Sequence, residues 1–300
     1  MELKFYNLMY VDLEEKRYLS GKTYNNEERI DLYVKGSCVL DKSLRINSLG
    51  GVNIITNNKT LISNSLHRIG YNNINIIEIP FSLNVPKGIP FFSAHFKIEV
   101  YKYFASCSHD EYSILLDSDV VCLNSLNEEF YSITNNRIPM IYYLNSYGGE
   151  KKLHDVRLID KDIEWLPWAG GEFIGGDAAF FNALYREILL FKDNYWNVVH
   201  NGLFHVGDEM LTSIALARLR KYGICPVDAK WFGVIHRYWS IAESKGIFEY
   251  KTSFIHLPGD KTFEYGLNLQ SNSVKKMFKA YWLYHFFKRV KSYVKRIISQ

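Results

Sequence analysis

An apolar run that ends in two acids constrains the fold more than any other feature of this chain. The run Ile-Leu-Leu at 114–116 shows no alternation of polar and apolar residues, which is typical of a strand covered on both faces. Asp117 and Asp119 follow it directly. Because ligands of open α/β sheets bind where such strands end, the pattern predicts a functional site at this point.

Two carboxylates one residue apart can hold a hard divalent cation. Mg²⁺ and Mn²⁺ prefer oxygen ligands and are often bound by one or two carboxylates together with substrate phosphates. Strand-end acids can equally cap a turn, and an Asp-x-Asp pattern alone does not separate these interpretations. The other segments of the chain have to decide between them.

Strand and helix patterns alternate through the first 120 residues. We expect strands at 3–10, 52–56 and 74–79 and helices at 25–44, 61–69 and 93–105. This alternation predicts an α/β fold with a mostly parallel central sheet flanked by helices, of the nucleotide-binding sort. The first strand is not followed by the glycine-rich signature of dinucleotide-binding folds, which argues against NAD or FAD.

The second half of the chain is less regular. A glycine-rich run at 170–176 would let the backbone approach a ligand closely. Helices are expected near 178–191 and from Asp208 onward, and a short strand near 254–255 leads to His256. Because no linker or internal repeat divides the chain, we expect one catalytic domain over residues 1–270 and an appended tail over 271–300.

The net charge of +4 is distributed unevenly. Residues 274–300 contain eight lysines and arginines and no acid, so this segment carries +8 and the remainder −4. Apolar residues recur there at three- and four-residue steps, which predicts a basic amphipathic helix on an anionic membrane surface. A helix packed on the domain with a solvated basic face is the alternative. The acidic remainder and the lack of a nucleic-acid-binding module argue against nucleic acid as a partner.

The cysteines and the apolar stretches indicate a cytoplasmic location. The four cysteines are far apart and show no Cys-x-x-Cys pair, so they resemble neither a zinc site nor a disulfide framework. No apolar stretch approaches the roughly 20 residues of a membrane span, and the N-terminus shows no standard signal. We therefore expect a cytoplasmic protein that is peripheral on the inner face of the membrane.

Four segments together resemble the GT-A glycosyltransferases. They are Phe-Lys-Ile-Glu at 96–99, Asp-Ser-Asp at 117–119, the glycine-rich run with Asp-Glu at 208–209, and His-Leu-Pro-Gly-Asp-Lys at 256–261. The closest likeness is to glycosyltransferase family 8, a retaining group that includes glycogenin and bacterial lipooligosaccharide galactosyltransferases. The likeness covers most of residues 1–265.

This resemblance implies a role for each matching residue. Asp117, Asp119 and His256 would hold a divalent metal, Mn²⁺ or Mg²⁺. A UDP-sugar donor would be contacted by Lys97, Asp117, Gly175, Gly176, Gly259 and Lys261. The spacing from Gly259 to Lys261 is one residue shorter here than in the family's His-x-x-Gly-x-x-Lys motif.

Residues 171–176 and 205–209 also resemble glycosyltransferase family 6, the blood-group transferases. Both families retain anomeric configuration and place a polar or acidic residue near the anomeric carbon, so the resemblance gives Asp208 and Glu209 as catalytic candidates. Glu209 could be a nucleophile beneath the sugar, or it could stabilise positive charge during a front-face attack. The two acids could instead simply favour a helix N-terminus.

The sequence therefore predicts a metal-dependent retaining glycosyltransferase. It would move a hexose or hexosamine from a UDP-sugar to a cell-surface glycan or glycolipid acceptor, such as lipopolysaccharide or capsule. Departure of a nucleoside diphosphate builds negative charge that a metal and nearby cations stabilise. One alternative is a catalytically silent GT-A-fold scaffold in a polysaccharide-assembly complex. The other is a metal-dependent phosphoesterase or nucleotidyltransferase that uses the same acids.

Overall fold

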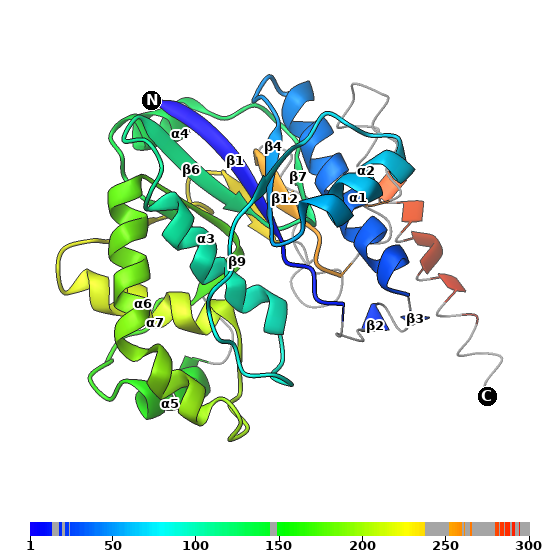
Figure 1. Ribbon diagram of the computed structural model, residues 1–300. Helices are drawn as coiled ribbons and strands as arrows, with labels where there is room; N and C mark the ends of the chain where they lie inside the picture. The colour runs from blue at the N-terminus through cyan, green and yellow to red at the C-terminus, as the bar shows by residue number, and fades with distance from the viewer. Residues whose placement is uncertain are drawn as a thin grey trace.

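A seven-stranded sheet forms the centre of the protein (Figure 1), in the order β10-β8-β9-β6-β1-β4-β5. The computed structural model describes residues 1–13, 18–19, 22–23, 25–144, 149–237, 252–259, 261, 265, 280–281, 283–284, 286–288, 290–291 and 294. In chain order the strands of this sheet are β1 (Glu2–Met9), β4 (Val52–Thr56), β5 (Asn75–Glu78), β6 (Glu111–Leu116), β8 (Met140–Tyr143), β9 (Ala169–Gly176) and β10 (Val227–Asp228).

The sheet is mostly parallel, with one reversed strand. β1 pairs in parallel with β4 and β6, β4 with β5, and β8 with β10. β9 runs antiparallel to both of its neighbours, β6 and β8. The beginning of β9 therefore lies at the same edge of the sheet as the carboxyl ends of β1 and β6. The predicted α/β fold with a mostly parallel sheet is confirmed.

Two smaller sheets accompany the central one. β7 (Val120–Cys122), β12 (Phe254–His256) and β11 (Ile235–Arg237) form a three-stranded sheet directly after the end of β6. β12 pairs antiparallel with β7, which brings His256 opposite Val120. β2 (Tyr18–Leu19) and β3 (Lys22–Thr23) form a short hairpin. Residues 117–119 thus join the two larger sheets.

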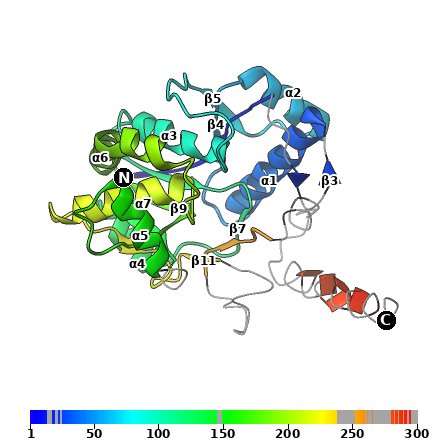
Figure 2. The same ribbon diagram turned by 90° about the horizontal axis from the view of Figure 1, so that it is seen from below.

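Helices cover both faces of the central sheet (Figures 1 and 2). α1 (Asn26–Ile46) and α2 (Lys59–Ile69) lie on one side, whereas α3 (Lys97–Phe104), α6 (Ala178–Val198) and α7 (Asp208–Arg220) lie on the other. The remaining described helices are α4 (Glu128–Asn135), α5 (Gly149–Ile159) and the 3₁₀ helix η1 (Phe92–Phe96). Every residue of β6 is buried, as its continuous apolar run predicts, because each face of the sheet packs against its own apolar core.

Polar residues fix the helix starts close to where the sequence places them. Asn25 caps α1 through a capping box with Glu28, and Asp177 accepts a hydrogen bond from the Phe180 N–H at the start of α6. These side chains satisfy backbone donors that the first helical turn leaves free. The helix predicted at 93–105 is divided into η1 and α3. The glycine-rich run at 170–176 forms most of strand β9.

The predicted tail helix lies partly within the described residues. Its described residues from 280 onward are helical, and they lie on the α1 side of the molecule in both views (Figures 1 and 2). Most of the segment 271–300 falls outside the described residues. No helix within the described residues is both long enough and apolar enough to cross a bilayer.

Candidate functional site

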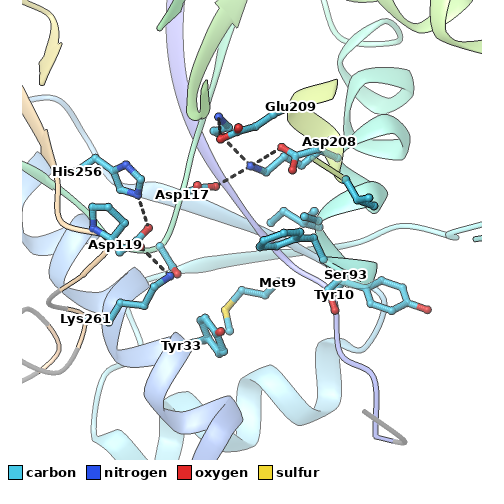
Figure 3. A pocket seen from close by; sticks show the side chains of 18 of the residues that line it. Met9, Tyr10, Tyr33, Ser93, Asp117, Asp119, Asp208, Glu209, His256 and Lys261 are labelled. Atoms are coloured by element: carbon cyan, nitrogen blue, oxygen red, sulfur yellow. Dashed lines mark hydrogen bonds and ion pairs between the residues drawn. The ribbon is translucent and has the colours of Figure 1, made fainter. Parts of the chain in front are cut away.

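A cavity of about 690 Å³ opens at the carboxyl edge of the central sheet. Its lining comes from the ends of β1 and β6, the start of β9, residues of α1, η1 and α5, the first residues of α3 and α7, and the ends of β11 and β12. This is the edge at which open α/β sheets bind their ligands. Figure 3 shows Tyr10 and Tyr33 towards one end, charged side chains in the middle, and Asp208 with Glu209 at the other end.

The middle of the cavity holds three residues that could ligate a metal. Asp117, Asp119 and His256 each present a ligand atom, and these atoms lie within 4.8 Å of one another. Two carboxylates and one imidazole form a donor set that suits Mn²⁺ or Mg²⁺. The structure therefore brings together the three predicted metal ligands, and their chemistry fits a divalent cation.

Asp119 is the most tightly held of the three. Its side chain is 2% exposed, Lys261 Nζ lies 2.7 Å from its Oδ2, and His256 Nε2 lies 3.1 Å from its Oδ1. Burial alone would raise the pKa of Asp119, but the positive charges of Lys261 and His256 outweigh burial and hold the pKa well below its ordinary value. Asp119 is thus an ionised carboxylate.

In this arrangement both ring nitrogens of His256 are protonated near neutral pH, so the imidazole is positively charged. Burial disfavours the charged imidazolium, yet the negative charges of Asp119 and Glu172 raise the pKa of His256 to about 9. A histidine must be neutral at the nitrogen that binds a metal. Metal binding at His256 would therefore release a proton.

Lys97 joins the metal-ligand cluster to the start of α7. Its Nζ lies 2.9 Å from Asp117 Oδ1 and 2.9 Å from Asp208 Oδ2, and it donates a hydrogen bond of 2.7 Å to the Gly171 carbonyl. Burial lowers the pKa of Lys97, but the two carboxylates more than compensate and raise it well above its ordinary value. Lys97 is therefore a fixed positive charge in the cavity wall, next to the place predicted for a donor phosphate.

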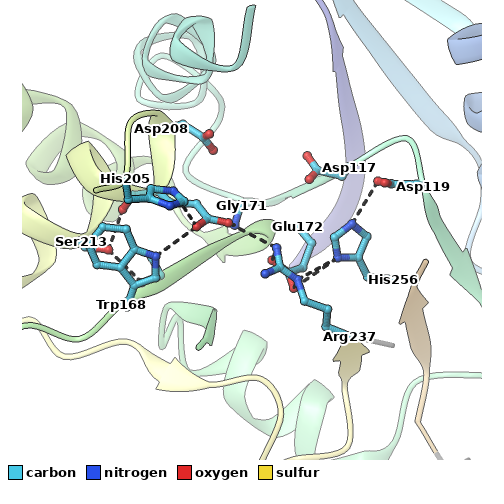
Figure 4. A network of polar contacts seen from close by, with 12 residues as sticks. Asp117, Asp119, Trp168, Gly171, Glu172, His205, Asp208, Ser213, Arg237 and His256 are labelled. Atoms are coloured by element: carbon cyan, nitrogen blue, oxygen red, sulfur yellow. Dashed lines mark hydrogen bonds and ion pairs between the residues drawn. The ribbon is translucent and has the colours of Figure 1, made fainter. Parts of the chain in front are cut away.

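Glu209 is surrounded by four donors, which Figure 4 labels as Trp168, Gly171, His205 and Arg237. Its Oε2 lies 3.0 Å from Trp168 Nε1 and 3.2 Å from His205 Nε2. Its Oε1 accepts from the Gly171 N–H and from Arg237 Nη2, both at 3.3 Å. Although burial raises the pKa of Glu209, hydrogen bonding to His205 and the charge of Arg237 are the main causes that hold it well below the ordinary value. Glu209 is an ionised side chain with both oxygens engaged.

The backbone conformation just before α7 fixes where Asp208 and Glu209 lie. Gly207 has φ 139° and ψ −173°, a conformation that is essentially restricted to glycine. Its N–H donates to the Tyr195 hydroxyl at 3.1 Å, and that hydroxyl lies 2.8 Å from Nε2 of the buried His95. This buried chain of hydrogen bonds ties the start of α7 to α6 and η1.

Arg237 and Glu172 connect the candidate metal ligands to Glu209 (Figure 4). Glu172 has no solvent exposure, and Arg237 Nε lies 2.8 Å from its Oε1. Arg237 Nη2 is 3.1 Å from Glu172 Oε2 and also reaches Glu209. His256 Nδ1 lies 3.3 Å from Glu172 Oε1. A continuous set of contacts therefore runs from Asp119 through His256, Glu172 and Arg237 to Glu209.

The three predicted donor-contacting glycines are not among the residues that line the cavity. Gly175 and Gly176 pair with Ile114 and Ser113 inside the sheet. Because β9 is antiparallel to β6, its glycines at 175–176 lie away from the carboxyl edge, whereas Gly171 lines the cavity. Gly259 is exposed, and its neighbour Pro258 lines the cavity in its place. Lys97, Asp117 and Lys261 do line it.

Among the residues of the site that were not predicted, Arg237 and Lys152 line the cavity, and the buried Glu172 contacts Arg237. Glu172 had a detectable signal, because a single acid within a glycine-rich apolar run is unusual for a buried strand. Arg237 had none, since only the pairing of distant strands brings it to the cavity. Lys152 is another such residue: its Nζ lies 3.7 Å from the centre of the Trp168 ring, and burial lowers its pKa to about 8.

Solved structures share this fold. An active-site mutant of LgtC aligns with a TM-score of 0.53 at 11% identity, covering 92% of this chain and 94% of that chain. A complex of the galactosyltransferase LgtC with donor and acceptor sugar analogues gives 0.49 at 11% identity, with the same coverage. Apo mouse xyloside xylosyltransferase 1 gives 0.50 at 10% identity, covering 85% of this chain and 97% of that chain.

The sequence itself matches no protein-family model and no curated protein. The structural matches to the LgtC mutant and to the xylosyltransferase span nearly all of each chain, so they establish the fold. The chain has the GT-A fold, as the four sequence segments predict.

Proposed function

We propose that this protein is a metal-dependent retaining glycosyltransferase that uses a UDP-sugar as donor and a glycan or glycolipid as acceptor. One observation carries the proposal: a single cavity joins the Asp117, Asp119 and His256 cluster to the carboxylate of Glu209. The GT-A fold, shared with solved sugar transferases, supports it.

The order of groups along the cavity matches the order of groups in a nucleotide sugar. Tyr10 and Tyr33 at one end offer aromatic faces to a nucleoside. The middle zone contains the candidate metal ligands and the ammonium groups of Lys97 and Lys261, which suit a diphosphate. Asp208 and Glu209 at the far end would then face the sugar.

In the proposed reaction, the cations of the chain stabilise the departing diphosphate. Lys261 and Lys97 are held in place by carboxylates, so they require little reorganisation when negative charge develops on the leaving oxygen. A divalent metal held by Asp117, Asp119 and His256 would supply further Lewis-acid stabilisation of that charge. The acceptor hydroxyl transfers its proton to the departing phosphate oxygen in a front-face attack.

Glu209 acts in this proposal as a fixed negative charge near the anomeric carbon. A nucleophilic role would require the carboxylate to release some of its four donors while forming a covalent bond. Each hydrogen bond to a charged group is worth about 1.5–3 kcal/mol. The observed contacts of Glu209 therefore favour stabilisation of an oxocarbenium-like transition state over double displacement.

The proposed location is the cytoplasmic face of a membrane. Along the described part of the tail, the exposed side chains include apolar groups at three- and four-residue steps and lysines. The apolar ones are Leu283, Phe286, Phe287, Val290 and Val294. Together with the +8 charge of residues 274–300, they would hold the enzyme near a lipid-linked acceptor.

Release of UDP tests the proposed activity. Purified protein is incubated with a panel of UDP-sugars, with and without Mn²⁺, and free UDP is measured. We expect Mn²⁺-dependent hydrolysis of one donor, and Asp119→Asn should lower its rate on the order of 10²- to 10³-fold, the scale for removing one group that stabilises transition-state charge. Glu187→Gln, which alters an acid paired with Arg218 outside the cavity, should behave as wild type.

Other outcomes identify the alternatives. Release of monophosphate or pyrophosphate without sugar transfer would support a phosphoesterase or nucleotidyltransferase. If no UDP is released from any donor in the panel and calorimetry shows no heat of UDP binding, the result would support a catalytically silent scaffold. Activity that is insensitive to a chelator would contradict the metal assignment.

A further inference from the structure

Glu172 is a charged side chain buried at the carboxyl edge of the central sheet. It belongs to β9, where Glu172 O accepts a backbone hydrogen bond of 3.3 Å from Asp117 N, and its exposure is 0%. Burying a carboxylate costs several kcal/mol unless it is well paired. If this position had only a structural role, an apolar residue would stabilise the fold more than a glutamate does.

One oxygen of this carboxylate lacks a well-aligned hydrogen bond. Among the described residues, Glu172 Oε1 accepts none of acceptable geometry, although Arg237 Nε is 2.8 Å away and His256 Nδ1 is 3.3 Å away. The ion-pair distance to Arg237 shows that the charge is compensated. A proton on His256 Nδ1 would lie on the side of the imidazole that is 3.3 Å from this oxygen.

The imidazole of His256 has two neutral forms with different consequences. With the proton on Nε2, this nitrogen donates to Asp119 at 3.1 Å, and Nδ1 accepts from Arg237 Nε at 3.3 Å. With the proton on Nδ1, this nitrogen faces Glu172 Oε1 at 3.3 Å, and Nε2 presents its lone pair beside Asp119. Only the second form can bind a metal together with Asp117 and Asp119.

The negative charge of Glu172 stabilises the second form, in competition with Asp119 and Arg237 Nε, which stabilise the first. A carboxylate that accepts from the non-ligating ring nitrogen fixes both the tautomer and the orientation of a metal-binding histidine. Arg237 contacts Glu172 through both Nε and Nη2, and its Nη2 also contacts Glu209. Movement of Glu172 would therefore disturb His256 and Glu209 together.

We propose that Glu172 is a positioning residue for the metal site and that it holds His256 in the tautomer that exposes Nε2. Arg237 holds the carboxylates of Glu172 and Glu209 in fixed positions relative to each other. This inference rests on the metal-dependent function proposed above. It adds two residues to that function: Glu172 acts through His256, and Arg237 acts through both glutamates.

Mn²⁺ binding tests this role without any turnover. The full chain is titrated with Mn²⁺, and the free ion is followed by electron paramagnetic resonance for wild type, Glu172→Gln and Glu187→Gln. Glu187 also pairs with an arginine, Arg218 at 2.6 Å, so its variant controls for loss of a carboxylate–arginine pair elsewhere. We expect the dissociation constant for Mn²⁺ to rise about 10- to 100-fold in Glu172→Gln only.

The outcomes separate this inference from the function on which it rests. Unchanged Mn²⁺ affinity in folded Glu172→Gln would overturn the positioning role while leaving metal dependence intact. Wild-type protein that binds no Mn²⁺ would overturn both. If Glu172→Gln does not fold, Arg237→Lys is titrated in its place. This variant keeps the positive charge but cannot contact Glu172 through two nitrogens at once. Unchanged Mn²⁺ affinity in Arg237→Lys would also overturn the proposal.

A second measurement reports the tautomer directly. Protein labelled with ¹⁵N-histidine and loaded with diamagnetic Mg²⁺ is compared by NMR with its Glu172→Gln variant, and His256→Gln identifies the relevant signals. Wild type should show a protonated Nδ1 and an unprotonated Nε2 at His256. A mixture of tautomers in Glu172→Gln is expected, whereas the same single tautomer in both proteins would contradict the inference.

Discussion

Lys97 Nζ lies 2.9 Å from Oδ1 of Asp117, which places a side-chain cation beside the ligand set of the candidate metal site. The same ammonium lies 2.9 Å from Asp208, so it is shared by two acids from different elements. Without it, Asp117 and Asp208 would share this part of the cavity without the ammonium that compensates both. The ammonium and a bound metal would both neutralise Asp117.

Replacing Lys97 by Met should destabilise the protein in a way that Mn²⁺ partly reverses. Removing one partner of a buried ion pair lowers the free energy of unfolding by about 3–5 kcal/mol. We expect a loss near the lower end of this range, because the Asp117 side chain is 28% exposed. Thermal denaturation should show a larger Mn²⁺-induced rise in melting temperature for Lys97→Met than for wild type. Lys102→Met on the same helix, where the side chain is 51% exposed, should change stability by less than about 0.5 kcal/mol. Equal Mn²⁺ shifts in wild type and Lys97→Met would count against shared neutralisation.

Replacing Gly207 by Ala should lower both stability and activity. A Cβ at this position would meet no atom closer than 3.6 Å, so the cost comes from the backbone conformation, at about 1–3 kcal/mol. The strain would move the start of α7 and with it Glu209, and small displacements at a reacting centre reduce kcat. Chemical denaturation and UDP release measure the two effects. Gly149→Ala, where a Cβ meets nothing within 4 Å, is the control, and an equal effect of both substitutions would refute the argument.

The contribution of Glu111 to stability should disappear in acid. Burial raises the pKa of Glu111, but hydrogen bonds from Lys4, Ser113 and Tyr6 outweigh burial and lower it below the ordinary 4.5. An acid with a lowered folded-state pKa stabilises the protein above its unfolded-state pKa, and this stabilisation is lost as the pH falls through the folded-state value.

The matching test compares wild type with Glu111→Gln at different pH values. The difference in free energy of unfolding should be about 1.5–3 kcal/mol at neutral pH and should shrink as the pH falls below about 4.5. Denaturant titrations from neutral to acidic pH measure it. Glu129→Gln, at an exposed position on α4, is the control. A difference that stays constant with pH would show that Glu111 is not ionised in the way described.

Deleting residues 274–300 should reduce binding to vesicles that contain anionic lipid. The segment carries eight basic residues, and each basic residue near an anionic surface contributes about 1 kcal/mol at physiological ionic strength. Vesicle co-sedimentation measures the binding, with neutral phosphatidylcholine vesicles as the control. Replacing both Phe286 and Phe287, which are 49% and 63% exposed, by Ser should weaken binding without changing the charge. Unchanged binding after the deletion would refute the membrane role of the tail.

The order of strands and helices could be predicted because local patterns specify it. β6 was recognisable from its continuous apolar run, and α1 from the polar residues at its start, since burial and capping act over a few neighbouring residues. The reversed direction of β9 was not predictable in the same way. Strand direction depends on pairing with β6 and β8, which are distant in the sequence.

Those residues of the candidate site that belong to short sequence motifs could be predicted. Asp117, Asp119 and His256 were identified from short motifs, and the structure places them together. Arg237 was not identified, because its role depends on Glu172 and Glu209 being within 3.3 Å of its guanidinium. Contacts between residues far apart in the sequence leave no local signal.

The reversed strand β9 also determines where the chain can tolerate insertions and deletions. Glu172 lies next to the registered pair Leu116–Phe173, and neighbouring residues of a strand point to opposite faces of the sheet. A one-residue insertion or deletion within β9 would turn the carboxylate away from His256 and bring glycine or phenylalanine to its place. We therefore expect changes of length in this part of the chain to be confined to the connections on either side of β9.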